Sequence, residues 1–474
     1  MTVRTITAEE QEIVNAHIAR ARGAMQVADA YDQATVDRLI RAIAWAAGNQ
    51  GTATRLAAMS VEESGMGSPE PTRRAKVLGI LRDALRQKSI GVIEEIPEKG
   101  LVKYAKPAGV IAALIPVTSP YVTPIGIAIY AVKCRNAVIF SPHPASRNTT
   151  HETVRLMRAA LERVGAPADL LQCIERPTIP VANALMAGCD LTIATGGQPM
   201  VRAAYGSGKP AYGVGAGNAT MVIDETADIE DAARNTRISK TNDNGSGCSA
   251  DGNLLVDSRI YDRFLAQLQK EGGYLVNERE KTLLRAAYWD ADGRRTPDTI
   301  ARAAAVVAAK AGFSIPPDKT FLIVEEDRIG RQHLFSTEKL GTVLAIFRYH
   351  GFDDALETMR AIFETGGKGH SCGIYSFDDD HIDRLAQTAP VSRIMVRQVQ
   401  SRANAGTFTN GMPMTSSMGC GIWGGNITNE NISLKHYMNV TWVSRPIPED
   451  RPSEAELFGE FYKSTILDEA RAAQ

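Results

Sequence analysis

Residues 109–116 read Gly-Val-Ile-Ala-Ala-Leu-Ile-Pro, and similar apolar runs follow at 136–141 (Asn-Ala-Val-Ile-Phe-Ser) and 191–195 (Leu-Thr-Ile-Ala-Thr). Segments of helix length separate the three runs. Short apolar runs that alternate with helices are typical of βαβ units, whose strands form a buried parallel sheet. Such sheets bind ligands at the carboxyl ends of their strands. We therefore expect an α/β fold whose chemistry lies at the residues that end these runs.

The rest of the chain extends this pattern. A second series of apolar runs predicts a second α/β domain, and its members are 252–256, 321–324, 343–347, 371–375 and 393–396. Helical spacing over residues 7–88 predicts several amphipathic helices, and residues 90–106 are a candidate β-hairpin. A charged amphipathic helix is expected over 453–473, with the apolar residues Leu457, Phe458, Phe461 and Ile466.

Composition narrows the class of protein. A chain of 474 residues is long enough for two or three domains. A net charge of −1 with interspersed signs argues against a nucleic-acid surface or a polybasic membrane patch. Prolines interrupt the longest apolar stretch, 109–131, so it cannot form a transmembrane helix. Six cysteines without CxxC pairs or zinc-spaced histidines predict reduced thiols, no metal site and a cytoplasmic location.

One cysteine differs from the others in its surroundings. Cys248 lies in the polar, glycine-punctuated segment 242–250 (Asn-Asp-Asn-Gly-Ser-Gly-Cys-Ser-Ala), ahead of a predicted strand. Free backbone N–H groups in such a turn can lower a thiol pKa or stabilise an oxyanion. The alternative is a small residue that fills a tight turn. Three glycines at alternate positions in 213–217 permit close approach of a ligand, although neither a Walker A sequence nor a GxGxxG after the first strand is present.

Several blocks together resemble one family. They are 136–144, 196–218, 239–250, 337–344 and 418–426, and their order and spacing resemble the CoA-acylating branch of the aldehyde dehydrogenase superfamily from about residue 10 to 446. Within the branch, residues 406–413 and 417–421 are most similar to acylating sulfoacetaldehyde dehydrogenases. The resemblance implies a Rossmann-type dinucleotide-binding domain, an α/β catalytic domain and a small β oligomerisation arm.

The resemblance also assigns roles to individual residues. Cys248 matches the nucleophile, and Thr118 in the loop Pro116–Pro120 matches a contact to the oxyanion and the nicotinamide side. Glu338 matches the carboxylate that holds the nicotinamide ribose. Further cofactor-binding positions are Pro116, Ser119, Ser141, Pro142, His143, Arg147, Gly196, Gly197, Gly213 and Gly215. Asn244, Arg397 and Cys420 are candidate substrate contacts.

One departure bears on the reaction. Hydrolytic members carry a glutamate that activates water, and Gly213 stands at that position here. General base catalysis typically contributes about 10²–10⁴-fold, so its loss slows hydrolysis of a thioester. A thiol such as CoA can then take the acyl group, because a thiolate needs no base. The same departure fits semialdehyde reductases that work through an acyl phosphate.

Other polar residues have competing interpretations. His143 and His370 can act in proton transfer or be structural histidines, and Cys420 can lie near the cleft or be a structural thiol. Lys240, Arg397 and Arg402 can offer charge to an anionic substrate or be surface cations. Arg147 and the lack of acidic residues in the loop 141–150 favour NADP over NAD.

The predicted protein is thus a CoA-acylating dehydrogenase of a small aldehyde, possible substrates including sulfoacetaldehyde, with NADP or NAD and coenzyme A. Acetaldehyde or propionaldehyde as substrate, an acyl-phosphate-linked reductase and a non-catalytic scaffold are the alternatives. Residues 1–230 are assigned to the NAD(P)-binding domain, 231–425 to the catalytic domain, and 426–474 to a return segment, a strand and the terminal helix. The hairpin and the strand at 438–446 are expected to build a homo-oligomer, a dimer or tetramer, without nucleic acid or membrane partners.

Overall fold

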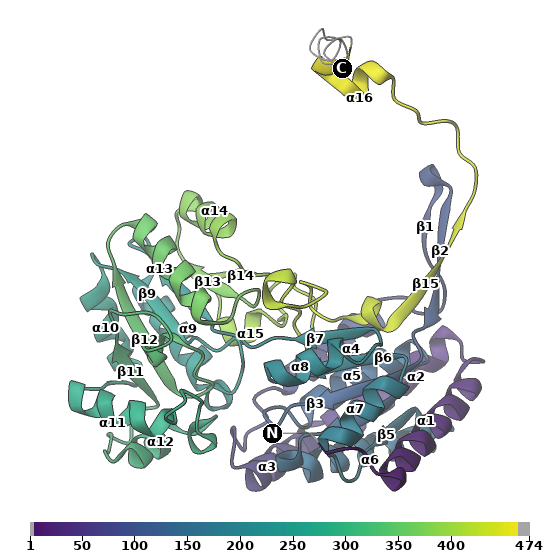
Figure 1. The fold of residues 1–474 in the computed structure, drawn as a ribbon, viewed down its shortest axis with the longest axis horizontal. Coiled ribbons are helices and arrows are strands. Elements are labelled where there is room, and N and C mark those ends of the chain that lie inside the picture. Colours follow the sequence, from purple (N-terminus) through teal and green to yellow (C-terminus); the bar gives the residue numbers. More distant parts are fainter. Residues whose placement is uncertain (1–3, 463–474) are drawn as a thin grey trace.

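The computed structural model describes residues 4–462, and its first body is built on a five-stranded parallel sheet (Figure 1). The strand order is β5-β4-β3-β6-β7, with bounds β3 Val110–Ile115, β4 Ala137–Pro142, β5 Leu171–Cys173, β6 Leu191–Thr195 and β7 Ala211–Val214. Every residue of β3 and β4 is buried, as expected of a sheet with helices on both faces. The parallel sheet predicted from the runs at 109, 136 and 191 is therefore confirmed.

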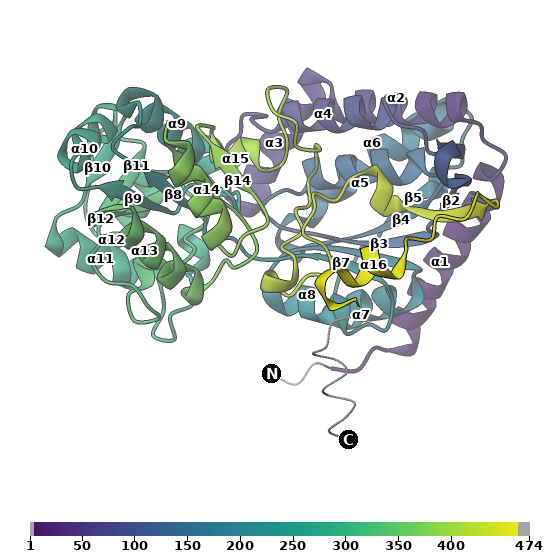
Figure 2. The ribbon, with the colours of Figure 1, turned by 90° about the horizontal axis from the view of Figure 1, so that it is seen from above.

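Helices cover both faces of this sheet, as Figure 2 shows. One layer contains α2 (Gln33–Gly48), α4 (Arg74–Leu85), α5 (Val122–Lys133) and α6 (Arg147–Arg163). The other contains α1 (Ala8–Ala28), α7 (Ile179–Gly188) and α8 (Gln198–Tyr205), while α3 (Gln50–Ser64) packs on α6. The helices predicted over 7–88 are thus present as α1 to α4. Figure 2 places α5 directly against the strands, and all of its residues are buried.

The second body is a seven-stranded parallel sheet in the order β10-β11-β12-β9-β8-β13-β14. Its strands are β8 Thr220–Ile223, β9 Asn253–Asp257, β10 Gly273–Leu275, β11 Phe321–Glu325, β12 Val343–Tyr349, β13 Cys372–Tyr375 and β14 Ile394–Val396. Leu254 packs in the cluster with α9 (Ile229–Thr241) and α10 (Tyr261–Lys270), whereas Leu255 packs in the cluster with α11 (Glu278–Tyr288), α12 (Ala304–Ala311), α13 (Phe352–Thr365) and α14 (Asp379–Thr388). Side chains that alternate along a strand thus supply two separate cores.

The boundaries between the bodies differ from those expected. β8 pairs with β9 and β13 of the second sheet, so the chain changes sheets within 215–219 and not at 230. Met414 already lies in the core of the first body, so the return begins before 426. The sequence does not reveal this change of sheet, because β8 directly follows the glycine-rich segment of the first body and its four residues are too few to assign to one sheet.

A third, antiparallel sheet forms an arm that projects from the first body (Figure 1). β1 (Gly91–Ile96) and β2 (Leu101–Pro107) make the predicted hairpin, and β15 (Met438–Ser444) pairs with β2 along its whole length. Beyond the arm, α16 covers only Glu454–Phe458, because Gly459 follows with a left-handed φ of 51°. The predicted helix over 453–473 is therefore interrupted, and its residues from 463 onward, including Ile466, lie outside the described residues. None of the helices between residues 4 and 462 has both the length and the apolar character that a membrane span needs.

Candidate active site

A cavity of about 880 Å³ lies between the two large sheets and is the setting of the candidate chemistry. It is lined by residues at the carboxyl ends of β3, β6 and β7, and by the loop after α9. The predicted residues that line it are Pro116, Thr118, Ser119, His143, Gly196, Gly197, Gly215, Cys248, Glu338 and Arg397. The strand ends therefore converge where a parallel sheet binds its ligands.

The loop that carries Cys248 has an unusual backbone that its polar residues stabilise. Asp243, Asn244 and Gly245 all have positive φ values, of 52°, 51° and 67°. Asp and Asn tolerate this region better than other residues with side chains. The Asp243 carboxylate accepts a hydrogen bond from the Ser68 amide at 2.7 Å and forms an ion pair with Arg73 at 2.9 Å. These contacts attach the loop to the first body.

Asn244 does not fulfil its predicted role as a substrate contact. Its side-chain amide donates to the Gly67 carbonyl at 2.7 Å, and Asn244 is not among the residues that line the cavity. Its neighbour Asn242 lines the cavity instead. The left-handed turn at 243–245 turns the Asn244 side chain away, which sequence spacing could not reveal.

Gly217 allows the Cys248 loop to approach the segment between β7 and β8. A Cβ atom at this position would lie 1.9 Å from the Cys248 carbonyl oxygen, so no other residue fits without displacing the loop. The Gly217 amide donates to Glu338 Oε1 at 3.0 Å. The other carboxylate oxygen, Oε2, accepts from Arg295 at 3.0 Å. Glu338 is therefore fixed at the cavity wall close to Cys248.

His370 is the titratable residue that the structure places beside Cys248. Its Nε2 lies 3.0 Å from Cys248 Sγ, and its Nδ1 lies 2.8 Å from the hydroxyl of Ser371. If Nδ1 carries the proton and donates to Ser371, Nε2 is free to accept the thiol proton. From the sequence, His370 could act in proton transfer or be structural. Its contact with Cys248 could not be predicted, because the two residues are 122 positions apart and the neighbours of His370 form no recognisable motif.

Electrostatics keep this pair neutral at rest. Burial, with the charges of Glu338 and Cys420, raises the pKa of the Cys248 thiol to about 12, against a lowering by Lys76 and Arg73. Burial and the nearby Arg393 guanidinium lower the pKa of His370 to about 3. The expectation that the glycine-rich loop would lower the thiol pKa is therefore wrong, because desolvation outweighs the lowering by Lys76 and Arg73. The resting site holds a thiol and an unprotonated imidazole, ready for transfer as the sulfur attacks.

Other predicted residues lie behind the cavity wall. Ser141, Pro142, Gly213 and Cys420 are buried and do not line it, and Arg147 is exposed outside it. A Cβ atom at Gly213 would contact Val201 and Tyr205 of α8, so packing against this helix also requires glycine there. Among the described residues that line the cavity, Glu338 is the one carboxylate, and Arg295 pairs with it.

The residues fit a dinucleotide at the end of the first sheet. Gly197 is the N-cap of α8, and no side chain caps this helix start, so its amides can meet an anion. In the loop 141–150, Arg147 begins α6, and the carboxylate of Glu63 from α3 accepts hydrogen bonds from the amides of Asn148 and Thr149, each at 2.8 Å. The loop itself contains no acidic residue, as the sequence indicated, and the fold brings one to it.

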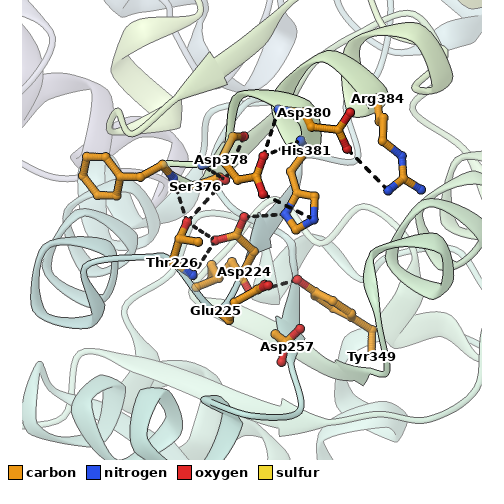
Figure 3. Close-up of polar contacts among 12 residues, drawn as sticks. Asp224, Glu225, Thr226, Asp257, Tyr349, Ser376, Asp378, Asp380, His381 and Arg384 are labelled. Carbon is orange, nitrogen blue, oxygen red and sulfur yellow. Dashed lines mark hydrogen bonds and ion pairs between the residues drawn. The ribbon is translucent and has the colours of Figure 1, made fainter.

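A second cluster of titratable residues lies at the carboxyl ends of β8 and β13 (Figure 3). Asp224, Glu225 and His381 have ligand atoms close enough to hold a metal ion. The Asp224 carboxylate, however, already accepts from Thr226 and lies 2.8 Å from His381 Nδ1, and Arg259 pairs with Glu225 at 2.8 Å. His381 also stacks on Phe352 with ring centroids 3.8 Å apart. We interpret the cluster as a structural link between α14 and β8.

Comparison with known proteins agrees with this geometry. The chain matches the aldehyde dehydrogenase family over residues 1–282. It is 42% identical to a sulfoacetaldehyde dehydrogenase of Acholeplasma sp, covering 94% of both chains. It is 39% identical to a sulfoacetaldehyde dehydrogenase (acylating) of Bilophila wadsworthia, covering 94% of this chain and 97% of that one.

A solved structure with bound CoA is also similar to this chain. The Rhodopseudomonas palustris propionaldehyde dehydrogenase with bound CoA and an acylated cysteine superposes with a TM-score of 0.81. Its identity is 26%, with 91% of this chain and 97% of that chain covered. The fold, the cavity and these relatives lead to one conclusion. The chain belongs to the aldehyde dehydrogenase family, and within it to the CoA-acylating oxidoreductases, which use NAD(P) and coenzyme A.

Proposed function

We propose that this protein converts sulfoacetaldehyde, CoA and NAD(P)⁺ to sulfoacetyl-CoA, NAD(P)H and a proton, through a thioester on Cys248. The observation that carries the proposal is the contact between Cys248, which lines the cavity of about 880 Å³, and the buried His370, 3.0 Å from its Sγ. The relatives that are 42% and 39% identical support this substrate.

In the first half of the reaction, His370 accepts the Cys248 proton as Sγ forms a bond to the carbonyl carbon. The developing oxyanion is met by backbone amides of the loop and by Thr118, which line the same cavity. NAD(P)⁺, when bound, accepts the hydride that leaves this carbon. The acyl group then remains on Cys248, and Glu338 at the cavity wall is placed to hold the nicotinamide ribose.

In the second half, the CoA sulfur displaces Cys248 from the acyl carbon, and the cysteine leaves as a thiol. His370 is placed to move the proton between the two sulfurs. Water is a far weaker acid than a thiol, so the same imidazole activates water less readily than it activates the CoA thiol. The Glu338 carboxylate is occupied by Arg295 and Gly217. The site thus favours transfer to a thiol over hydrolysis.

We propose that NADP⁺ is the preferred cofactor. Arg147 is an exposed cation at the start of α6, where it can meet a 2′-phosphate. The negative charge of Glu63 would repel a 2′-phosphate, but the two backbone amides that donate hydrogen bonds to this carboxylate reduce the effect. Arg147→Ala should lower kcat/KM for NADP⁺ and leave that for NAD⁺ unchanged. A higher wild-type kcat/KM for NAD⁺ would contradict the preference.

We also propose that the protein is a cytoplasmic homo-oligomer that assembles through its arm. The six cysteines are free thiols, which suits a reducing compartment. β15 is an edge strand of the arm, with Val440, Trp442 and Val443 exposed. An uncovered edge of this kind readily pairs with another chain.

The test of the function is a substrate panel with and without CoA. Sulfoacetaldehyde should give CoA-dependent NAD(P)H formation, and sulfoacetyl-CoA should be detected by mass spectrometry. Cys248→Ala should abolish both signals, whereas Cys173→Ser, which alters a thiol at the end of β5 outside the cavity, should retain them. A higher kcat/KM for acetaldehyde or propionaldehyde than for sulfoacetaldehyde would show that the uncharged aldehyde is the substrate. Dependence on inorganic phosphate, or full activity without CoA, would overturn the acylating reaction.

A further inference from the structure

We propose that the ammonium group of Lys76 binds the anionic group of the substrate and thereby selects small aldehydes that carry a sulfonate beside the carbonyl. This inference rests on the proposed function and assigns a role to a residue that the sequence did not single out. Lys76 lies in the first turn of α4 and lines the same cavity as Cys248.

The other cations of the cavity mostly have partners. Arg73 pairs with Asp243 at 2.9 Å and also donates to the Thr118 carbonyl at 3.2 Å. Arg295 pairs with Glu338 at 3.0 Å. Arg397 donates to the Ser376 carbonyl and stacks on Phe377, with 4.5 Å between its guanidinium carbon and the ring centroid. Their charges and donors are therefore largely committed to the protein.

Lys76 is different, because its ammonium group has no hydrogen-bond or ion-pair partner among residues 4–462. Arg402 also lacks one, but it is exposed, whereas Lys76 is half-buried. A partly buried cation without a counter-charge is costly, and an anionic ligand offsets that cost. Desolvation and the neighbouring Arg73 lower the pKa of Lys76 to about 8, against the opposing effects of Cys248 and Asp243.

The position of Lys76 also suits a very short substrate. In sulfoacetaldehyde a single methylene separates the sulfonate from the carbonyl carbon, so an anion-binding group must lie close to Cys248 Sγ. The cations whose charge lowers the pKa of this thiol are Lys76 and Arg73. Arg73 is held by Asp243 and Thr118, so we assign it to positioning the two loops. Lys76 is therefore the cation that is free to contact the sulfonate.

The decisive experiment compares sulfoacetaldehyde with propionaldehyde, which has no charge. Lys76→Met should lower kcat/KM for sulfoacetaldehyde about 10- to 100-fold more than kcat/KM for propionaldehyde, and the difference should lie mainly in KM. Lys76→Arg should restore part of the loss. Lys88→Met removes the same charge from an exposed site after α4 and should change neither substrate.

Three outcomes would overturn the inference. An equal loss with both aldehydes would mean that Lys76 acts on the Cys248 thiolate. A raised KM for CoA would mean that it binds a CoA phosphate. If Arg402→Met loses the preference for sulfoacetaldehyde while Lys76→Met keeps it, the anion-binding residue is Arg402 at the rim of the cavity. If the wild-type enzyme is inactive on sulfoacetaldehyde, the proposed substrate is refuted. This result is distinct from the three above, which concern only the role of Lys76.

A pH profile of the wild-type enzyme supplies a test that needs no variant. Arg73, Asp243 and Cys248 are the charged and titratable groups that influence Lys76, and the free ammonium loses its proton around pH 8. KM for sulfoacetaldehyde should therefore rise, relative to KM for propionaldehyde, between about pH 7 and about pH 9. A constant ratio across this range would contradict the role of Lys76.

Discussion

His370 is the residue whose replacement tests the chemistry most directly. His370→Ala removes the base beside Cys248 Sγ, so the rate of NAD(P)H formation in the first turnover should fall about 10²–10⁴-fold. Stopped-flow measurement with saturating aldehyde gives this rate. His350→Ala, which alters an exposed histidine after β12, is the matched control and should behave as wild type. A normal first turnover in His370→Ala would exclude the imidazole as proton acceptor.

The same histidine makes a prediction about stability and pH. Burial and Arg393 hold the pKa of His370 near 3, whereas an unfolded histidine titrates near its ordinary value. The unfolded chain thus binds the extra proton first, and the free energy of unfolding falls as pH drops below about 6.5, by up to about 1.4 kcal/mol per pH unit.

Chemical denaturation at several pH values measures this dependence. The His370→Ala variant, which lacks the group, should lose less stability than wild type between about pH 6.5 and about pH 4.5. Parallel curves for the two proteins would show that the folded state also protonates His370 in this range.

Of the two residues in the Cys248–His370 pair, the sequence identifies only Cys248 as a candidate nucleophile. Cys248 could be found because its loop is polar and rich in glycine, whereas His370 and Lys76 have ordinary neighbours along the chain. Only the fold brings His370 to Cys248 across 122 residues, and only the fold leaves Lys76 without a partner. Pairing and burial are properties of tertiary structure, so local spacing cannot supply them.

Among the elements, the segment between β7 and β8 imposes the tightest restriction. Gly217→Ala should displace the Cys248 loop, because the added Cβ would lie 1.9 Å from the Cys248 carbonyl oxygen. We expect at least about a 10²-fold loss of kcat/KM, since small misplacements of a reacting group are that costly. Steady-state kinetics and thermal unfolding together measure the effect.

The control makes the same change where space is open. Gly23 lies exposed within α1, and a Cβ there meets no atom within 4 Å. Gly23→Ala should retain activity and gain about 0.5–1 kcal/mol of stability, because alanine favours the helix. Full activity of Gly217→Ala would show that the loop can reach Cys248 without the close approach.

In the described part of the chain, all strands of five or more residues are predicted from the sequence, whereas four of the six strands with three or four residues are not, and β13 and β14 are the two exceptions. The strands β3, β4, β9, β11 and β12 have apolar runs that stand out in the sequence. β5 and β10 contain three residues each, and β7 and β8 four, too few for periodicity to register. Because the sequence does not reveal β8, it predicts the domain boundary at 230 and not between β7 and β8.

For the whole molecule, the arm makes a prediction about assembly. The side chains of Val440 and Trp442 lie on one face of β15 and are 39% and 56% exposed, so both are available to a second chain. Replacing both with glutamate should shift the protein to a smaller species in light scattering. Val27→Glu changes a similarly exposed residue on α1 and should leave the mass unchanged. An unaltered mass for the double variant would exclude this face from the interface.

Burial of the thiols has a consequence for how the enzyme withstands oxidants. Burial raises the pKa of all six cysteines, Cys248 included. Hydrogen peroxide and alkylating reagents attack thiolates, so a resting molecule that holds its sulfurs protonated reacts slowly with them. The nucleophile becomes strongly reactive only as it transfers its proton to His370, when an aldehyde is already in place. Hydrogen peroxide should therefore inactivate the resting enzyme slowly, and more quickly during turnover, when the Cys248 sulfur loses its proton.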